Sequence, residues 1–389
     1  WHIDTHGTGV QRSTVYSGTF RVNKTGYSLY NTNHQQLHDT TMKTRFFRGK
    51  NILITGGTGS IGSEVLKQLI PFGPKKIRVF SRDEYKQYQL KFKYQGVKDV
   101  EIDYVLGDVR DLEAVIDASR NIDILFHVAA YKHVPQSEEL PEEFIKTNIH
   151  GALNIKKAAR ANKIKNVISI SSDKAVYPSN VMGLTKAIQE KVFSSHSLQK
   201  DDYTSKFVNV RFGNVIGTKG SIFPIFYHQI SHGVHVPITD ERMTRFFMTK
   251  DEAIELIFWS AINASDGDTV IRRMKSIKIM DLFNAFLEVL KQRKDYPRYK
   301  MGIRVGEKLH ESLVTQDEFL KVKSKSAYYI ISPYRESEIE KNVIKYSLKK
   351  STDIQEMQSD YPKNYFSYSA VKKLVATYVE DTKKINQII

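Results

Sequence analysis

Short apolar runs alternate with longer amphipathic stretches from Lys50 to about Phe212, and this alternation constrains the fold more than any other feature of the chain. The runs are rich in Val and Ile, which suits strands that are buried on both faces, and the stretches between them have helical spacing. Repeated strand–helix units form a parallel sheet covered by helices. We predict strands over 51–55, 76–80, 102–106, 124–128, 166–171 and 207–211.

The intervening segments predict helices over 60–70, 112–120, 147–161 and 181–195. A cluster of Pro71, Phe72, Gly73 and Pro74 closes the first helix, since it cannot continue one. After about residue 212 the alternation loosens, and the clearest helices there are 251–264 and 281–291. The chain therefore divides into a leader over 1–45, a first domain over 46–211, a smaller lobe over 212–335 and a tail over 336–389 that ends in a helix. Strands or helices of the smaller lobe can return to the first domain.

The leader is rich in Thr, Ser, Asn, Gln, Gly and His and has no sustained apolar period, so we expect it to be poorly ordered. Met42 stands just before the first strong strand, and we expect it to be the natural start. The pairs His2 with His6 and His34 with His38 have helical spacing, but no matched carboxylate accompanies them. We therefore predict no metal site.

Composition excludes several classes of protein. The chain contains no Cys, so a thiolate nucleophile, a disulfide scaffold and a sulfur-ligated metal are excluded. Its formal net charge is +16, yet Lys is scattered and no basic run is interleaved with aromatic residues, so we expect no nucleic-acid partner. No apolar run is long enough to cross a membrane, and we expect a soluble, cytoplasmic protein.

A glycine-rich turn joins the first predicted strand to the first predicted helix. Gly56, Gly59 and Gly62 lie in TGGTGSIG, where they allow a tight turn, a close approach of the backbone to a pyrophosphate and close helix–strand packing. The strand before and the helix after make this pattern specific for a dinucleotide. The expected fold class is therefore α/β: a Rossmann-type doubly wound parallel sheet with a smaller C-terminal α/β substrate lobe.

The end of the second strand selects between NAD and NADP. A carboxylate there would bind the ribose 2′-hydroxyl, whereas an Arg would bind a 2′-phosphate. Ser81 and Arg82 come first, followed by Asp83, so we predict NADP. Asp108 follows the third strand, where it can either accept a hydrogen bond from the adenine amino group or cap the next helix.

The fifth strand leads into SSDKAVYPSNVMGLTK, which covers 171–186. The extended short-chain dehydrogenase superfamily, which this arrangement resembles, has a Ser or Thr here and a Tyr-x-x-x-Lys on the next helix. One helical turn places that Tyr and Lys on the same face, so the ammonium lowers the Tyr pKa. Lys186 is present, but Met182 occupies the Tyr position.

The segment also resembles a narrower family, the UDP-N-acetylglucosamine 4,6-dehydratases of polysaccharide and flagellin-sugar biosynthesis. The resemblance spans about 50–335 and rests on SDKA with the following PSNVMGLTK, and on collinear motifs: SRDEYKQ, GDVRD, AAYKHVP, KTN, RFGNVIGTKGS, ITDERMTRFFMT and GIRVGEKLHE. It implies a tightly held NADP that is used and restored in each turnover. The expected cofactor contacts are Gly56, Gly59, Ser60, Ile61, Gly62, Ser81, Arg82, Asp108, Val109, Ala129, Ala130 and Lys186.

In the reaction that this resemblance implies, C4 of the sugar is oxidised, water is lost across C5 and C6, and C4 remains a ketone. An acid and a base are then needed at C5 and C6. The adjacent Asp173 and Lys174 supply such a pair, although alone they would read as a surface ion pair. By resemblance Lys174 is the C5 base and Asp173 the acid at the 6-hydroxyl. Lys174 needs a lowered pKa for that role, and we expect Lys186 and the nicotinamide to lower it.

Methionine has no proton to exchange, so Met182 cannot deprotonate the 4-hydroxyl. That step falls to Asp173, Lys174, Ser172 or a water. Substrate contacts follow from the remaining matched motifs, with guanidinium groups for the diphosphate or uracil and Glu307 to position Arg304. The expected substrate contacts are Lys132, Asn148, Asn214, Arg245, Arg304 and Glu307.

The sequence thus predicts a UDP-N-acetylglucosamine 4,6-dehydratase, with or without inversion at C5. Two alternatives are a nucleotide-sugar 4-epimerase or reductase of the same fold and a catalytically silent NADP-binding protein. Met182 with the Asp173–Lys174 pair disfavours an epimerase, which relies on the missing Tyr. The resemblance further implies a homo-oligomer, such as a dimer or hexamer.

Overall fold

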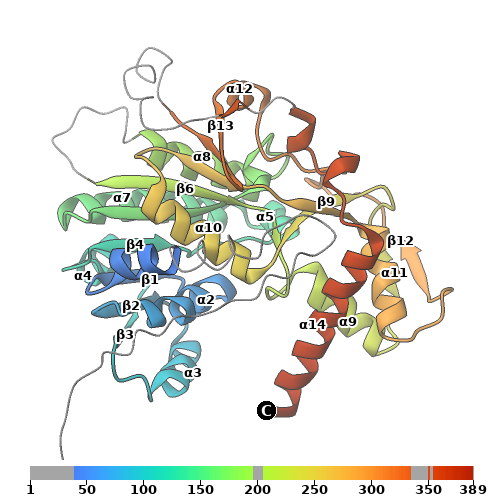
Figure 1. Ribbon diagram of the computed structural model, residues 1–389, viewed down its shortest axis with the longest axis horizontal. Helices are drawn as coiled ribbons and strands as arrows, with labels where there is room; N and C mark the ends of the chain where they lie inside the picture. Colours follow the sequence, from blue (N-terminus) through green and yellow to red (C-terminus); the bar gives the residue numbers. More distant parts are fainter. Residues whose placement is uncertain (1–38, 196–204, 334–348, 351–353, 389) are drawn as a thin grey trace, which may run out of the picture. The chain divides into compact units, whose positions relative to one another are not determined.

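A ten-stranded sheet organises the chain in the computed structural model, which describes residues 39–195, 205–333, 349–350 and 354–388 (Figure 1). Its strand order is β15-β13-β14-β10-β6-β5-β4-β1-β2-β3, and the seven strands from β3 to β10 are parallel. These seven are β1 (Asn51–Thr55), β2 (Lys76–Ser81), β3 (Glu101–Leu106), β4 (Ile124–His127), β5 (Asn166–Ser172), β6 (Lys206–Phe212) and β10 (Thr269–Arg272). The order reverses between β1 and β4, and in doubly wound sheets ligands bind at that point, outside the carboxyl ends of the strands.

Helices cover both faces of the sheet (Figure 1). Along β1, Ile52 and Ile54 face one hydrophobic core, and Leu53 faces the other, because successive side chains of a strand point to opposite sides. The first core includes residues of α2 (Ser60–Leu69), α3 (Glu84–Tyr94) and α10 (Lys250–Asn263), and the second includes residues of α4 (Leu112–Ala118), α7 (Gly151–Ala161) and α8 (Val181–Ser194). This arrangement confirms the predicted Rossmann-type α/β class.

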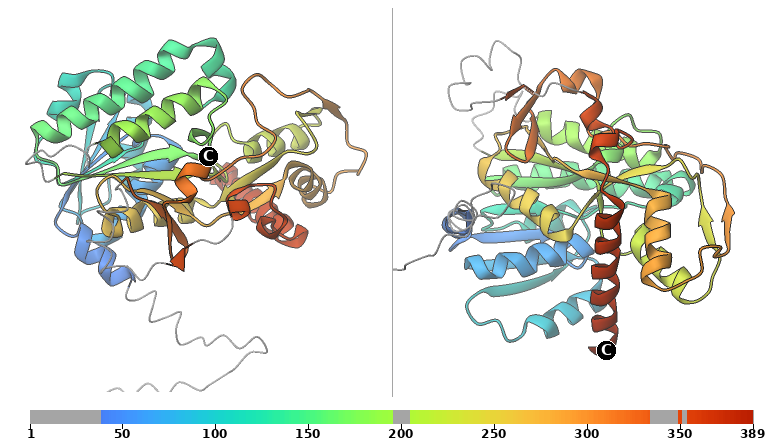
Figure 2. Two further views of the ribbon diagram at one scale, coloured as in Figure 1. Left: turned by 90° about the horizontal axis from the view of Figure 1, so that it is seen from above. Right: turned by 45° about the vertical axis from the view of Figure 1, so that its right-hand side comes forward.

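A smaller lobe has its own core. It contains a three-stranded sheet, β11-β9-β7, and a two-stranded sheet, β12-β8. Its helices α9 (Ile222–Ser231), α11 (Ile279–Val289) and α14 (Tyr368–Ile388) pack together, and α14 runs beside α11 (Figure 2). The small strands are β7 (Asn214–Val215), β8 (Val236–Ile238), β9 (Thr244–Met248), β11 (Lys275–Lys278) and β12 (Arg298–Lys300).

Part of the chain after 212 returns to the large sheet. Strand β10 extends the parallel series beside β6, and β14 (Tyr328–Ile331) and β13 (Val322–Lys325) continue it antiparallel. The edge strand β15 (Lys349–Lys350) comes from the predicted tail. The segments 46–211 and 212–335 therefore share one sheet, since β10, β14 and β13 of the second segment continue the sheet of the first beyond β6.

The structure differs from the prediction at the N-terminus. Residues 39–47 are helical, so the predicted leader over 1–45 ends in a helix rather than in irregular chain. The chain divides into two units directly after Met42, and Phe47 is fully buried in the core of the second unit. Residues 1–38, including the paired His2, His6, His34 and His38, lie outside the described residues.

Element boundaries agree with the predicted ones to within a few residues, with one informative exception. The helix predicted over 147–161 begins with a wider π turn, Ile145–His150, before α7. Such turns are frequent at functional sites. Within the described residues no helix is long and apolar enough to cross a membrane, and no cluster of metal-ligating side chains occurs.

Candidate active site

The glycine turn after β1 is pressed against the end of β4. Gly56 has a φ of 64°, and a Cβ there would lie 2.8 Å from Ala129 Cα. A Cβ on Gly62 would lie 2.4 Å from the Gly56 carbonyl oxygen. Helix α2 begins at Ser60, so Gly62 lies in its first turn, and no side chain caps the helix. Its first backbone N–H groups have no partner within the helix and suit a pyrophosphate.

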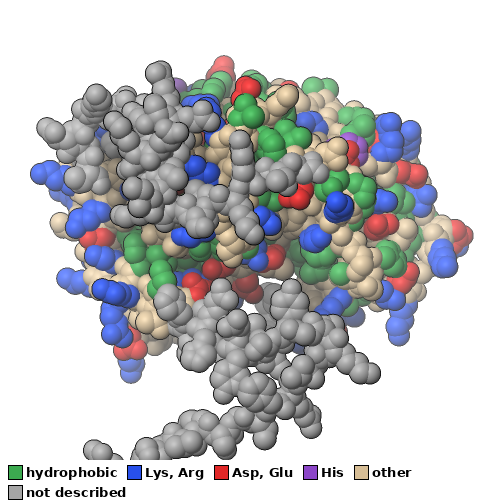
Figure 3. Space-filling view, turned by 45° about the horizontal axis from the view of Figure 1, so that its top comes forward, with side chains coloured by type: hydrophobic (Ala, Val, Ile, Leu, Met, Phe, Trp, Pro, Cys, Tyr) green, Lys and Arg blue, Asp and Glu red, His purple; other side chains and the backbone are tan. Residues whose placement is uncertain are grey.

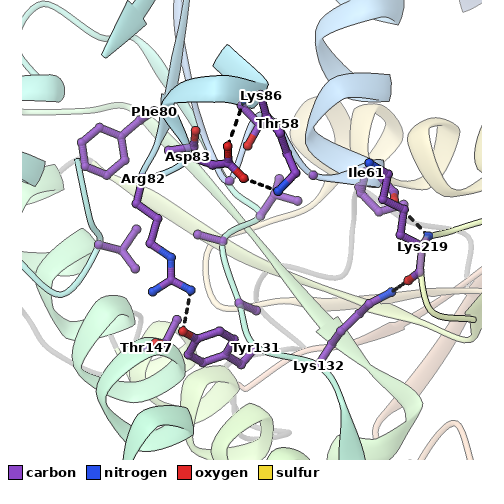
Figure 4. A pocket seen from close by; sticks show the side chains of 18 of the residues that line it. Thr58, Ile61, Phe80, Arg82, Asp83, Lys86, Tyr131, Lys132, Thr147 and Lys219 are labelled. Atoms are coloured by element: carbon purple, nitrogen blue, oxygen red, sulfur yellow. Dashed lines mark hydrogen bonds and ion pairs between the residues drawn. The ribbon is translucent and has the colours of Figure 1, made fainter. Parts of the chain in front are cut away.

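A pocket of about 550 Å³ opens at this turn (Figure 4). It extends along the carboxyl ends of β1, β2, β3 and β4, which is the place where the strand order reverses. The glycine cradle and the uncapped helix fit a dinucleotide. The predicted contacts that line it are Gly56, Gly59, Ser60, Ile61, Ser81, Arg82, Asp108, Val109, Ala129, Ala130 and Lys132. Gly62 lies behind the turn, where it serves helix–strand packing.

The end of β2 brings two cations to the pocket wall. Arg82 lies over the Tyr131 ring, 4.8 Å from its centroid, and donates to the Tyr131 hydroxyl. Lys86, in the first turn of α3, also lines the pocket. Asp83, the carboxylate that follows Arg82, caps α3 by accepting from the Lys86 backbone N–H at 2.9 Å and forms an ion pair with the Lys86 ammonium (Figure 4). Both interactions of the Asp83 carboxylate are thus with Lys86.

Asp108 was expected either to meet adenine or to cap a helix. Its carboxylate pairs with Arg110 at 2.8 Å and Arg82 at 3.4 Å, while Asp111 caps α4. Burial works against the charge, but Arg110 and Arg82 outweigh it and hold the pKa of Asp108 below its usual value. The capping alternative is therefore wrong. Asp108 remains at the pocket wall, as a carboxylate neutralised by two guanidinium groups.

A chain of hydrogen bonds through Lys132, Lys219 and Ser60, here called the strap, closes one side of the pocket. Lys132 Nζ donates to the Lys219 carbonyl at 2.7 Å, and the Lys219 backbone N–H donates to Ser60 Oγ at 3.2 Å (Figure 4). Gly220 packs on the His133 ring so closely that a Cβ would lie 2.6 Å from it. The strap ties the loop after β7 to the loop after β4 and to the start of α2, and Lys132 is one of its parts.

The predicted catalytic pair lies at the carboxyl end of β5, in the single turn Asp173–Ala175. Asp173 is 0% exposed. Its Oδ1 accepts from Ser172 Oγ and from Lys174 Nζ, both at 3.0 Å. Its Oδ2 is buried without a hydrogen-bond partner among the described residues. Burial raises the pKa of Asp173, although Lys174 opposes the shift, so this carboxyl is suited to carry a proton.

The pKa of Lys174 shifts in the direction opposite to the predicted one. Burial alone would lower the pKa of Lys174, but the adjacent carboxylates of Asp173 and Glu311 outweigh it and raise the pKa above its usual value. Lys186 was expected to lower the pKa of Lys174, but the cation that opposes the rise is Arg245. The lowered pKa belongs to Lys186 instead. Burial lowers the pKa of Lys186 to about 7, with Glu190 opposing the shift.

Lys186 and Met182 both point into the packed side of α8. The Lys186 ammonium donates to the Ile170 carbonyl at 2.8 Å and to Gln189 Oε1 at 2.9 Å, and its side chain is 6% exposed. Met182 is likewise buried. The described lining of the pocket includes no residue of β5 or α8. The pocket and the Asp173–Lys174 pair are thus two neighbouring parts of one edge of the sheet.

Two predicted substrate contacts have other duties. Asn148 is 0% exposed: its Oδ1 accepts from the Tyr131 backbone N–H at 2.9 Å, and its Nδ2 donates to the Tyr131 carbonyl and Thr185 Oγ1, both at 3.0 Å. Arg245 is also buried and donates to the carbonyls of Thr244, Lys308 and Leu309. Each fixes a loop beside the site, because its polar atoms are already bonded within the protein.

The other substrate contacts stay predictions. Asn214 Oδ1 lies 3.3 Å from Lys174 Nζ, directly at the acid–base pair. Arg304 is exposed, and Glu307 lies 3.9 Å from its guanidinium, in a loop that reaches the start of α8. There Ser179 Oγ and Asn180 Nδ2 each donate to the Gly306 carbonyl at 2.8 Å.

The residues at the site to which the sequence reasoning gave no functional role include Lys86, Tyr131, Lys219 and Glu311. All four belong to segments that carried the family resemblance: SRDEYKQ, AAYKHVP, RFGNVIGTKGS and GIRVGEKLHE. A Lys or Glu inside such a segment is also a common surface residue, so its type alone did not distinguish it. Membership in a matched segment was the available signal.

Comparison with known proteins identifies the family. The family described as polysaccharide biosynthesis protein matches residues 52–333. The chain belongs to this family. The inverting UDP-N-acetylglucosamine 4,6-dehydratase of Campylobacter jejuni is 39% identical, over 74% of this chain and 84% of its own length. This likeness confirms the resemblance drawn from SDKA and the collinear motifs.

Two further relatives show how far the family extends. The UDP-glucose 4-epimerase of Rickettsia prowazekii is 37% identical, over 73% of this chain and 83% of its own length. The crystal structure of Pen from Bacillus thuringiensis superposes with a TM-score of 0.78 at 36% identity, and covers 85% of this chain and 98% of that one. Relatives with different names thus match this chain over most of their own length.

Proposed function

We propose that this protein is an NADP-dependent UDP-N-acetylglucosamine 4,6-dehydratase that forms a 4-keto-6-deoxy sugar nucleotide for glycan or polysaccharide biosynthesis. The observation that carries the proposal is the ion pair between the buried Asp173 and the partly buried Lys174 at the end of β5, on the edge of the sheet where ligands bind. Loss of water across C5 and C6 needs an acid and a base together, and this pair supplies both.

NADP, when bound, supplies the hydride acceptor for C4 and the hydride donor for C6. The proton steps belong to the pair. Passing one proton from the Lys174 ammonium to the Asp173 carboxylate, 3.0 Å away, creates a neutral amine and a neutral carboxyl with no change in net charge. The amine takes the C5 proton, and the carboxyl protonates the departing 6-hydroxyl, which leaves as water. Lys174 then returns its proton to C5, and the proton that the 4-hydroxyl loses on oxidation restores the Lys174 ammonium, so the pair ends as it began.

The runner-up function is 4-epimerisation, and the name of the Rickettsia relative favours it. An epimerase of this fold needs a base at the 4-hydroxyl and no acid–base pair at C5 and C6. Met182 has no exchangeable proton, and Asp173 with Lys174 would have no task. A nucleic-acid role has less support, because Lys and Arg are interspersed with Asp and Glu on the face shown in Figure 3.

The test is incubation of the purified protein with UDP-N-acetylglucosamine in D₂O, followed by proton NMR. We expect a new 6-methyl signal, deuterium at C5 and a configuration at C5 that the couplings reveal. UDP-glucose run in parallel should give no UDP-galactose. Interconversion of 4-epimers without a 6-methyl product would reject dehydration in favour of the runner-up. Light scattering and cell fractionation check the predicted homo-oligomer and cytoplasmic location.

A further inference from the structure

Glu311 is a third ionisable group at the acid–base pair. It is 2% exposed, and its Oε1 lies 3.5 Å from Lys174 Nζ and 3.8 Å from Arg245 Nε. Its Oε2 lies 3.0 Å from Lys308 Nζ. A buried carboxylate is costly unless it is paired, and here three cations from three segments of the chain surround it. Glu311 is therefore held as an anion beside Lys174.

The backbone of Glu311 is fixed as firmly as its side chain. Its N–H donates to Ser359 Oγ at 2.8 Å, and its carbonyl accepts from the Ser359 N–H at 2.9 Å. Ser359 is itself fully buried and shares a hydrogen bond of 2.7 Å with Thr244 Oγ1. This anchor comes from the C-terminal segment, which the sequence placed outside the functional part of the chain. The position of the Glu311 carboxylate is thus built into the fold.

The Lys174 ammonium has three protons, and three acceptors surround it. These are Asp173 Oδ1 at 3.0 Å, Asn214 Oδ1 at 3.3 Å and Glu311 Oε1 at 3.5 Å. We propose, on the basis of the proposed function, that Glu311 is a positioning residue that holds the Lys174 amino group between two carboxylates and leaves Asp173 as the one that carries the transferable proton.

The two carboxylates differ in the direction of their pKa shifts. Burial raises the pKa of Glu311, but Lys174, Arg245 and Lys308 outweigh it, and the net shift is downward. The pKa of Asp173 is raised by burial and by the charge of Glu311. Carboxyl groups whose surroundings separate their pKa values take different roles: one stays ionised, and the other is the acid. His310, the neighbour of Glu311, faces Thr244 and Asp360 instead.

The test uses Glu311→Gln, which keeps the shape and removes the charge. Its kcat should fall by about 10- to 100-fold, the scale for losing a supporting partner of a functional group, with KM nearly unchanged. Glu311 raises the pKa of both Asp173 and Lys174, so its loss lowers both. The whole pH profile of kcat should therefore move to lower pH. An unmoved profile would overturn the proposal.

Two further variants control for a merely structural effect. Glu318→Gln removes a carboxylate from the same part of the chain, one that pairs with Arg211 at 3.0 Å and touches neither Asp173 nor Lys174. It should lose thermal stability without moving the pH profile. Glu311→Asp keeps the charge but withdraws it by one methylene, so its profile should lie between those of wild type and Glu311→Gln. It carries the test alone if Glu311→Gln does not fold.

A measurement without turnover separates this inference from the proposed function. In protein labelled at the lysine ε-carbon, the Lys174 signal, assigned by its loss in Lys174→Met, reports the pKa of that amine. The pKa should be lower in Glu311→Gln than in wild type. Should wild type make no 6-methyl product while this pKa still falls, the dehydratase proposal fails and the contact stands. Product formation by wild type with no change in this pKa rejects the role of Glu311 alone.

Discussion

Asp173 and Lys174 are neighbours in sequence, yet their surroundings differ in one respect that matters for chemistry. Asp173 is enclosed, and one of its oxygens has no hydrogen-bond partner in the described part of the chain, whereas Lys174 is surrounded by acceptors. A raised Lys174 pKa means that the amine must first lose its proton to act as a base. Asp173, whose pKa is also raised, is the nearest group able to accept it.

Replacing Lys174 by Ala tests this division of labour. The variant should bind NADP and UDP-N-acetylglucosamine normally, because the glycine turn is untouched, but lose turnover by about 10²- to 10⁴-fold, the scale for a general acid or base. The C5 proton should stop exchanging with deuterium in NMR. Continued exchange at the native rate would assign the base elsewhere. Met182→Tyr, by contrast, should be tolerated.

Cofactor choice is tested at the two cations beside β2. If Arg82 and Lys86 bind a 2′-phosphate, then Arg82→Ala and Lys86→Ala should each weaken NADP by about 10- to 100-fold, the value of one charged hydrogen bond, and leave NAD unchanged. Fluorescence titration of both cofactors measures the preference. Lys91→Ala, on an exposed position of the same helix, is the matched control. Equal losses for NAD and NADP would remove the specificity role.

At the scale of elements, the contact between α8 and the turn after β5 positions the proposed catalytic pair, Asp173 and Lys174. Gly183 permits it, because a Cβ there would lie only 2.3 Å from the Lys174 carbonyl oxygen. The Asn180 side chain caps α8 by accepting from the Gly183 N–H at 2.7 Å, which places this glycine in the first turn of the helix. The first turn of α8 thus packs directly on the backbone of the Asp173–Ala175 turn, at Gly183 and Lys174.

Gly183→Ala should therefore force α8 and the turn apart. A displacement near 1 Å costs about 10²-fold when reacting groups depend on alignment, so kcat should fall by about that factor. NADP binding, measured by titration, should stay near wild type because the pocket is formed by other elements. Lys191→Ala, on the exposed side of α8, should change neither quantity. Native kcat in Gly183→Ala would show that this contact does not position Lys174.

At the scale of the whole molecule, truncation can locate the residue at which the folded unit begins. Phe47 is fully buried, with its ring centroid 5.0 Å from that of Phe258 in α10. The helix over 39–47 therefore contributes core residues to the unit that begins at Lys43.

Two truncations separate the leader from this core. A chain starting at Met42 keeps Phe46 and Phe47, so its melting temperature and turnover should stay close to those of the full chain. A chain starting at Gly49 loses both, and its free energy of unfolding should fall by about 3–5 kcal/mol or more, the usual cost of one buried aromatic ring. Calorimetry and denaturant unfolding compare them. A large loss already at Met42 would assign a structural role to the residues before it.

The sequence by itself determined the parallel sheet, the glycine turn, and the edge of the sheet at which Ser81, Arg82, Asp108, Asp173 and Lys174 lie. Each of these follows from local periodicity. The apolar pattern of a strand predicts the residue at which the strand ends, and therefore the residues that follow it at the edge of the sheet. Only the tertiary structure decided where side-chain polar atoms go. Asn148 and Arg245 were expected at the substrate, but the fold uses their donors to hold loops.

The protonation of the site likewise depended on distant segments. Glu311, which Ser359 anchors, reaches Lys174 from a segment far along the chain and helps raise a pKa that Lys186 and the nicotinamide were expected to lower. No local pattern encodes such a meeting, because it requires several long loops to close at once. A pKa is set by the sum of burial and all nearby charges, and that sum exists only after the chain has folded.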